Sequence, residues 1–290
     1  MVTLNSLTLE NPIVASSGAL AFGRGYRWDW PLVRCGVIRP SRIGAVVTKT
    51  LTADSWAGNW RGWNQWQVLR PLRGGWVNAF GLTNRGLRWF VEREYLHVYY
   101  RNLIVSITDP NPQRIPEMVA LLNQVDILAV EVNLSCPNTP QWVDLQRRWM
   151  LTRDVLVKSR QVTRHPLVVK IGYLTEAERD GVASACWSAD VDAIAMINSV
   201  PFRNLFPGRQ SPLKFGGGVS GELIRKLALE QVQWFAEQRN FPVIGGGGVS
   251  TQAHVKQFLA AGAQAVSVGS AHILRPWIST HLASQCTRAQ

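Results

Sequence analysis

The sequence predicts an α/β fold, a (β/α)8 TIM barrel that spans all 290 residues as a single domain. Apolar runs of strand length recur eight times along the chain, and helical patterns separate most of them. Strands and helices that alternate through right-handed crossovers close most naturally into such a barrel, and an open, doubly wound sheet is the alternative. The eight runs cover residues 13–15, 45–47, 103–107, 127–132, 167–171, 193–197, 242–244 and 265–268.

Helix signals lie between several of these runs. Thr175 and Glu178 have the spacing of a capping box, which predicts that a helix begins there. Ser250 or Thr251 can cap another helix, and Gly262 is placed to end it. A third helical pattern spans residues 221–238. These helices follow strands, as the barrel requires.

Two segments fall outside this alternation. Residues 2–4 and 7–9, joined at Asn5 and Ser6, predict an N-terminal β-hairpin that covers the bottom of the barrel. A long Trp-rich insertion after the second strand is expected to fold over the barrel mouth. It could stack on bases, line a substrate pocket or meet a partner subunit, and packing into a satellite core is an equal alternative. Its tryptophans are Trp56, Trp60, Trp63, Trp66 and Trp76.

The composition is that of a well-packed, basic globular protein. Hydrophobic residues make up 46% and charged residues 17% of the chain, which argues against a disordered chain. The net charge is +12. Thirteen Lys and Arg against four Asp and Glu between residues 24 and 101 favour the binding of anions, although a solvated arginine-rich surface explains the same pattern.

No apolar run approaches the roughly 20 residues of a membrane span. Since the N-terminus lacks a secretory signal, a cytoplasmic protein is expected.

One thiol is distinguished among four widely spaced cysteines. Cys136 lies between Asn133 and Asn138, just beyond the apolar run 127–132, and so falls on a loop at the carboxyl end of a strand. Barrel enzymes place their chemistry at this end. Two flanking carboxamides can hold a planar, polar ligand while the thiol acts on one carbon. Without a Cys-x-x-Cys pair or a neighbouring His, the cysteines predict reduced thiols, no metal site and no iron–sulfur cluster.

Polar and glycine residues follow the other predicted strands as well, and a barrel brings such residues to one mouth. The glycines after the seventh and eighth strands supply backbone N–H groups before a helix, which predicts the phosphate site of a cofactor. A further glycine-rich turn, residues 216–221, could pass close to the same ligand. The residues expected at the mouth are Ser16, Ser17, Gly18, Thr48, Lys49, Thr50, Asn78, Asn133, Cys136, Asn138, Lys170, Asn198, Ser199, Gly247, Gly248, Gly269 and Ser270.

These residues resemble the class 1 dihydroorotate dehydrogenases, which are FMN enzymes of pyrimidine biosynthesis, and the resemblance runs nearly end to end. Its most specific part is the block 133–138, Asn-Leu-Ser-Cys-Pro-Asn. The cysteine in this block is similar to class 1, since the membrane-associated class 2 enzymes have serine there. The other matching parts are Asn11-Pro12, Ser17-Gly18, residues 48–50, 78–84, 169–170, 198–199 and 217–221, and the two phosphate loops.

The resemblance implies roles for these residues. Cys136 would take a proton from C5 of dihydroorotate while hydride leaves C6 for the flavin N5, and Lys170 would stabilise the anion of reduced FMN. The residues implied in substrate binding are Lys49, Asn78, Phe80, Gly81, Leu82, Asn133, Asn138, Asn198 and Ser199. Those implied in binding FMN are Ser16, Ser17, Lys49, Thr50, Asn133, Lys170, Asn198, Gly221, Gly247, Gly248, Gly269 and Ser270.

Substrate, acceptor and partners have alternatives. The chain departs from the family after the second strand, at residues 58–63, and after Cys136, at Gln141-Trp142. Oxidation or reduction of another dihydropyrimidine, including tRNA dihydrouridine synthesis, and a non-catalytic flavin-binding homologue are therefore alternatives. The tRNA enzymes add a C-terminal RNA-binding domain, so a nucleic-acid partner is not expected. Class 1 enzymes use fumarate, as homodimers, or NAD through an iron–sulfur flavoprotein subunit, which implies a homodimer with or without such an electron-transfer subunit.

Overall fold

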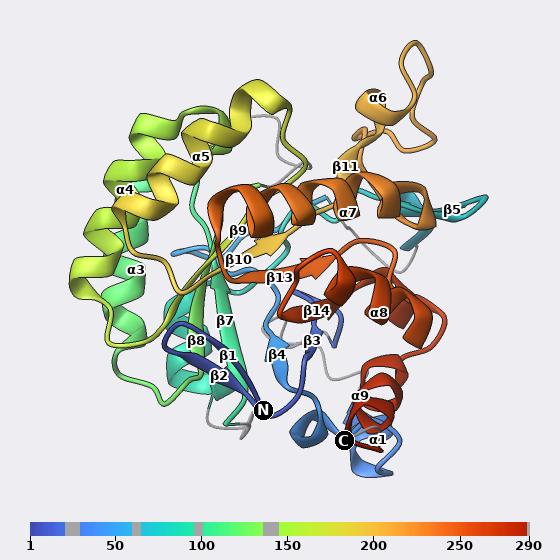
Figure 1. The fold of residues 1–290 in the computed structure, drawn as a ribbon, viewed down its shortest axis with the longest axis horizontal. Helices are drawn as coiled ribbons and strands as arrows, with labels where there is room; N and C mark the ends of the chain where they lie inside the picture. Colours follow the sequence, from blue (N-terminus) through green and yellow to red (C-terminus); the bar gives the residue numbers. More distant parts are fainter. Residues whose placement is uncertain (21–29, 60–64, 96–100, 136–144, 289–290) are drawn as a thin grey trace.

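A closed barrel of eight parallel strands forms the centre of the computed structural model, which describes residues 1–20, 30–59, 65–95, 101–135 and 145–288. The strands follow one another around the barrel in chain order, and β14 pairs with β3 to close it (Figure 1). Each of the eight apolar runs overlaps one strand, so the predicted (β/α)8 barrel is confirmed and the open sheet is excluded. The strands are β3 (Ile13–Ala15), β4 (Ala45–Val47), β7 (Leu103–Ile107), β8 (Ala129–Asn133), β9 (Leu167–Lys170), β10 (Ala193–Met196), β13 (Val243–Gly246) and β14 (Ala265–Val268).

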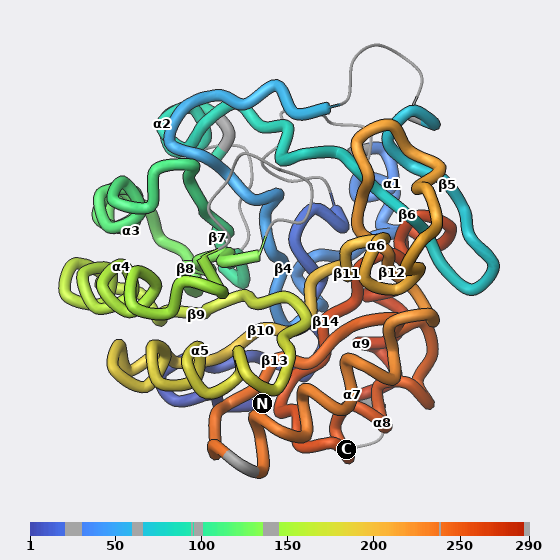
Figure 2. The backbone as a smooth tube through the Cα atoms, turned by 90° about the horizontal axis from the view of Figure 1, so that it is seen from above, coloured from blue at the N-terminus to red at the C-terminus, as the bar shows by residue number. Residues whose placement is uncertain are grey.

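Helices surround the barrel, as the view from above shows (Figure 2). Helix α2 continues as a π-helical turn to Glu94, and α7 continues in the same way to Gln238. None of the described helices has both the length and the apolar character needed to cross a bilayer. The helices are α1 (Trp30–Arg34), α2 (Leu87–Trp89), α3 (Ile115–Leu122), α4 (Trp149–Val162), α5 (Glu176–Ser188), α6 (Phe202–Leu205), α7 (Arg225–Gln233), α8 (Gln252–Ala260) and α9 (Ile278–Arg288).

The capping residues lie where the sequence predicts them. The backbone N–H of Thr175 donates to Glu178 Oε2 at 2.8 Å at the start of α5. Of the two candidates, Ser250 and Thr251, it is Thr251 that caps α8: its Oγ1 accepts the backbone N–H of His254. Gly262 follows α8 with φ +96°, a conformation that an L side chain rarely adopts. These contacts satisfy groups that a helix end leaves unpaired.

The barrel interior is apolar at its amino-terminal end, where the predicted hairpin seals it. Strands β1 (Val2–Leu4) and β2 (Leu7–Leu9) pair antiparallel, with Asn5 at φ 51° in the turn. Three hairpin leucines are fully buried and pack in one cluster with inward side chains of the barrel strands. A separate, larger apolar cluster lies between the strands and the helices. The hairpin therefore covers the barrel bottom, as expected.

The described part of the Trp-rich insertion forms a second sheet, which the sequence does not predict. Strands β5 (Leu69–Leu72) and β6 (Gly75–Asn78) form a hairpin that pairs with β12 (Gly218–Gly221), and β12 pairs with β11 (Val200–Pro201). The expected glycine-rich turn at 216–221 is therefore mostly strand, because four of its residues pair with β6. Trp66 is 45% exposed, Trp56 and Trp76 are half-buried, and Trp60 and Trp63 lie outside the described residues.

Candidate active site

Inward side chains at the carboxyl ends of the strands form the candidate site. Asn133 ends β8 and Lys170 ends β9, and the strand register places the two side by side. Both residues are buried, with 4% and 8% of their surface exposed. Since parallel strands point their carboxyl ends toward the same mouth, Asn133 and Lys170 lie together at the mouth where they are expected. Their roles in binding remain predictions.

A hydrogen-bonded network joins the ends of four strands at this mouth. Ser17 Oγ donates to the carbonyl of Thr48 at 2.8 Å and lies 3.1 Å from Thr50 Oγ1. Thr50 Oγ1 lies 3.0 Å from Ser106 Oγ and accepts from Asn133 Nδ2 at 3.1 Å. The network fixes the side chains of three predicted site residues, Ser17, Thr50 and Asn133. Preorganised polar groups of this kind are what a charge-shifting reaction requires.

Two predicted substrate ligands hold the residue that precedes Cys136. The backbone N–H of Ser135 donates to Asn133 Oδ1 at 3.1 Å. Asn198 Nδ2 donates to the Ser135 carbonyl and, at 3.3 Å, to its Oγ, while Asn198 Oδ1 accepts from the Ser199 N–H. The asparagines therefore position the entrance to the segment that carries Cys136. Cys136 and Asn138 themselves lie outside the described residues.

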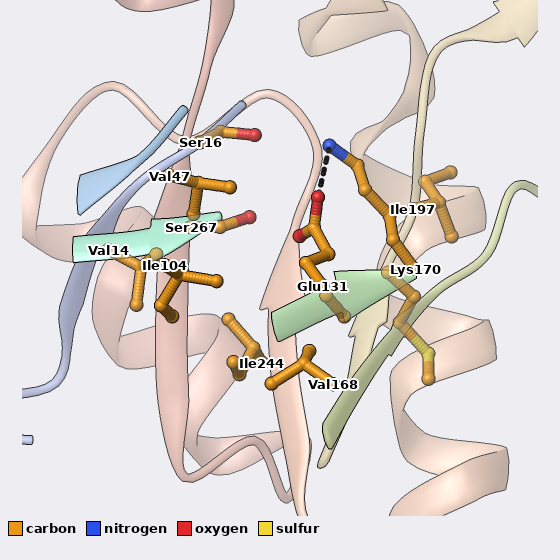
Figure 3. A pocket seen from close by; sticks show the side chains of 12 residues that line it. Val14, Ser16, Val47, Ile104, Glu131, Val168, Lys170, Ile197, Ile244 and Ser267 are labelled. Atoms are coloured by element: carbon orange, nitrogen blue, oxygen red, sulfur yellow. Dashed lines mark ion pairs between the residues drawn. The ribbon is translucent and has the colours of Figure 1, made fainter. Parts of the chain in front are cut away.

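Lys170 faces a carboxylate, Glu131, that is not among the residues expected at the mouth. Glu131 lies two residues before Asn133 on β8, and its Oε1 is 3.9 Å from Lys170 Nζ (Figure 3). Both side chains line a pocket inside the barrel, together with Ser16, Ser267 and apolar residues. The sequence does contain a sign of this inward carboxylate. Glu131 interrupts the apolar run 127–132 two residues before Asn133, and side chains two residues apart on a strand point to the same face.

The Lys170–Glu131 pair is buried, with 11% and 4% of the side chains exposed. Opposite unit charges 3.9 Å apart attract by about 4 kcal/mol at an effective dielectric constant of about 20. Removal of both charges from water offsets much of this attraction. The separation exceeds hydrogen-bond length, and Lys170 Nζ donates to no residue that the structure describes. Its N–H groups are available to a ligand at the mouth.

Lys49 lies against the loop that follows β3. A side chain on Gly18, which has φ +75°, would approach Lys49 Cδ to 3.0 Å. The glycine therefore lets the lysine pass close to the Ser16–Ser17 segment. Asn78 donates to the carbonyl of Gly218 at 3.2 Å, so it is fixed by the second sheet. Substrate binding by Lys49, Asn78, Phe80, Gly81 and Leu82 stays a prediction.

The glycines after β13 and β14 form a cradle of backbone groups. Gly247 and Gly248 have φ +135° and +75°, and a side chain on Gly248 would lie 2.5 Å from the carbonyl oxygen of Gly221. A side chain on Gly269 would lie 3.6 Å from Ser16 Cβ, which places the first and last strand loops together. The N–H groups of Gly247, Gly248, Gly269 and Ser270 donate to no acceptor in the described part of the chain. Free backbone N–H groups in such loops, two of them here on positive-φ glycines, fit a phosphate.

Two arginines beside this cradle were not predicted. Arg225 donates to the Gly248 carbonyl at 3.4 Å, and Arg275 donates to the Ser250 carbonyl at 2.8 Å. Both belong to segments that read as ordinary helix and loop, so no signal in the sequence marks them. Arg225 is ion-paired with Glu222 at 3.0 Å, so the positive charge that favours an anion near the loop is mainly that of Arg275. Burial, and secondly the charge of Arg225, lower the pKa of His254, which keeps this neighbour neutral near pH 7.

His272 supports the cradle through a hydrogen bond to the backbone of Gly269. Its Nδ1 lies 3.0 Å from the carbonyl oxygen of Gly269. Burial lowers the pKa of His272 to about 4, so the ring is neutral and Nδ1–H donates to that carbonyl. Its Nε2 has no partner among the described residues. The histidine therefore fixes Gly269 by a hydrogen bond from a neutral ring.

Comparison with known proteins identifies the family. The family model for dihydroorotate dehydrogenase matches residues 1–288. A relative from Petrotoga mobilis is 28% identical over 95% of this chain and 89% of its own length, and one from Thermodesulfovibrio yellowstonii is 30% identical over 95% and 88%. Both are named catalytic subunit of dihydroorotate dehydrogenase B (NAD(+)). The ligand-free enzyme from Eimeria tenella shares the fold with a TM-score of 0.75 at 21% identity, over 98% of this chain and 85% of that chain. The resemblance seen in the motifs is confirmed, and the chain belongs to the dihydroorotate dehydrogenase family.

Proposed function

We propose that this chain oxidises dihydroorotate to orotate with FMN as its cofactor, in pyrimidine biosynthesis. Family membership over residues 1–288 supports this reaction. The observation that carries it is the meeting of Lys170, Asn133 and the Thr50 network at one barrel mouth, beside a cradle of free N–H groups. A cation and a phosphate cradle at one mouth suit a phosphorylated redox cofactor better than a purely structural end of a barrel.

The described residues fit FMN at both of its ends. The amides of Gly247, Gly248, Gly269 and Ser270 would hold the phosphate, with Arg275 adding positive charge nearby. Lys170 would lie by the ring, where its free ammonium donors stabilise negative charge. Bound FMN supplies the acceptor for a hydride. Ser16, Ser17 and Thr50, which the network and Gly269 hold at the same mouth, would contact FMN between these two ends.

The chain's own groups perform the proton transfer. Cys136, as thiolate, would remove the proton from C5 of dihydroorotate, and the C5=C6 double bond forms as hydride departs from C6. An unperturbed thiol has a pKa of about 8.5, so the site would have to favour the thiolate, as cations near a thiol can. Asn133 and Asn198 would position both the substrate and the Ser135 entrance to this segment. The role of Cys136 rests on the family resemblance.

An electron-transfer subunit and NAD are the proposed route for reoxidation. The relatives named above are catalytic subunits of an NAD(+)-linked enzyme, and a catalytic subunit implies at least one other kind of subunit. A homodimer of this chain within that assembly, and a cytoplasmic location, stay predictions from the sequence. tRNA dihydrouridine synthesis is less well supported, because the matching family model is that of dihydroorotate dehydrogenase.

Anaerobic mixing of the FMN-loaded protein with dihydroorotate tests the proposal. We expect the purified protein to bind FMN and the visible flavin absorption to bleach as orotate forms in equal amount. Dihydrouracil and dihydrouridine serve as matched substrates that lack the carboxylate. A protein that binds FMN and is bleached by these as fast as by dihydroorotate would contradict the substrate assignment, and failure to bind FMN would contradict the whole proposal.

A further inference from the structure

Glu131 is a buried carboxylate that the proposed reaction does not use. Its side chain is 4% exposed, and Oε1 has no hydrogen-bond partner among the residues that the structure describes. A buried carboxylate is strongly disfavoured unless a cation compensates its charge. The compensating group is the ammonium of Lys170, which lies 3.9 Å away. Each of these two charges depends on the other for its burial.

The geometry places the carboxylate behind the lysine as seen from the mouth. The register pairs Asn133 with Lys170 and Glu131 with Val168, so Glu131 lies one layer deeper in the barrel than Lys170. Figure 3 shows the Lys170 ammonium above the Glu131 carboxylate, inside a pocket whose other polar groups are the hydroxyls of Ser16 and Ser267. A ligand at the mouth would therefore experience the lysine charge together with the opposite charge behind it.

We propose that Glu131 is a positioning residue that acts through Lys170 and lowers the midpoint potential of bound FMN. This inference rests on the proposed function. A lone ammonium beside the ring favours the reduced cofactor, because reduction adds negative charge. A carboxylate 3.9 Å from that ammonium cancels part of its field in a site with little water. It also holds the long lysine side chain at the mouth without occupying its hydrogen-bond donors.

Redox titration of the FMN-loaded protein tests this tuning. Glu131→Gln keeps the side-chain size and removes the charge, and we expect the reduced-to-oxidised ratio of FMN at a given potential to rise about tenfold, equivalent to a midpoint shift of about +30 mV for a two-electron couple. Lys170→Met should shift the midpoint in the opposite direction, and the double variant should lie between the two single variants. Ser267→Ala, in the same pocket but uncharged, should leave the midpoint unchanged.

The outcomes separate this inference from the proposed function. Wild-type protein that binds no FMN overturns both. FMN that binds normally but has the same midpoint in wild type and Glu131→Gln overturns only the inference, as does a shift in the same direction in both single variants. Lys170→Met leaves the Glu131 charge buried and unpaired, so this variant can fail to fold. In that case the double variant takes its place in the comparison, and its FMN midpoint potential must lie below that of Glu131→Gln. Urea unfolding of the FMN-free variants should show coupling between the two sites, and strict additivity would also overturn the inference.

Discussion

The two ends of the barrel share the same eight strands and differ in every other respect. At the amino-terminal end, Leu4, Leu7 and Leu9 of the hairpin are fully buried against apolar barrel side chains. At the carboxyl-terminal end, the buried groups include polar side chains, and Thr50 and Asn133 are hydrogen-bonded to each other. The hairpin closes the amino-terminal end, while the carboxyl-terminal end is lined by groups that can bind a ligand. Substitutions at the bottom should therefore change stability, and those at the mouth should change chemistry.

The largest expected effect is on the rate of flavin reduction, from a substitution that leaves the barrel folded. Cys136→Ala removes the proposed base, and proton transfer by a positioned side chain contributes about 10²- to 10⁴-fold to a rate. We expect flavin reduction by dihydroorotate to slow by about that factor, with FMN binding and the unfolding midpoint close to wild type. Anaerobic stopped-flow measures the rate. Cys35→Ala, at an exposed cysteine, is the matched control; an equal loss in both variants would remove the base role from Cys136.

The next effect concerns the closed end of the barrel. Leu7→Ala empties a fully buried site between the hairpin and the barrel interior, and such truncations cost about 2–5 kcal/mol of unfolding free energy. Urea unfolding followed by circular dichroism measures the loss. Thr8→Ala, on the exposed face of the same strand, should cost less than about 1 kcal/mol. The flavin reduction rate per bound FMN should be unchanged in both, and a tenfold fall in Leu7→Ala would mean that the two ends are not independent.

The same contrast explains which features could be predicted from the sequence. The barrel strands are short runs of β-branched residues, so their number, order and carboxyl ends could be predicted, and with them the positions of Lys170 and Asn133. The leucine alternation in residues 2–9 likewise predicts the hairpin. These features depend on local patterns, and a closed parallel barrel converts them into positions in space.

Features that depend on distant pairing were missed. Strand β12 reads as a glycine-rich turn and becomes a strand only because Asn78 and Gly218, 140 residues apart, pair across the second sheet. Arg225 and Arg275 reach the cradle carbonyls from helix and loop positions that no local pattern marks. Glu131 lies within the apolar run 127–132, and its partner Lys170 comes from another strand, so no local pattern reveals that this single inward charge is compensated. Cys136 was found by its motif, and its position lies outside the described residues.

The pH dependence of stability tests the comparison further, because His272 lies at the mouth end of the barrel but has a structural role: it fixes the Gly269 carbonyl. Its pKa is lowered from 6.5 to about 4 in the folded protein, so the unfolded chain binds the proton first as pH falls. Stability from this site is present above pH 6.5 and decreases between about 6.5 and 4, by up to about 3 kcal/mol. His272→Asn keeps a donor for the Gly269 carbonyl and should flatten that part of the stability curve. Urea unfolding at several pH values measures it; an unchanged slope would show that His272 does not titrate in this way.

The smallest effect tests whether a residue next to the cradle can be purely structural. Thr251 caps α8 directly after the 247–250 loop, where its Oγ1 accepts the His254 N–H. Thr251→Ala should lower the unfolding free energy by about 1 kcal/mol, the usual cost of losing such a cap. Thr251→Ser retains the hydroxyl and should recover most of the loss. Because the capping oxygen faces into the helix end, the flavin reduction rate per bound FMN should be unchanged in both variants. If Thr251→Ala weakened FMN binding tenfold while Thr251→Ser did not, the hydroxyl of Thr251 would be part of the phosphate cradle. A residue directly after the 247–250 loop would then serve both the stability of α8 and the binding of the cofactor.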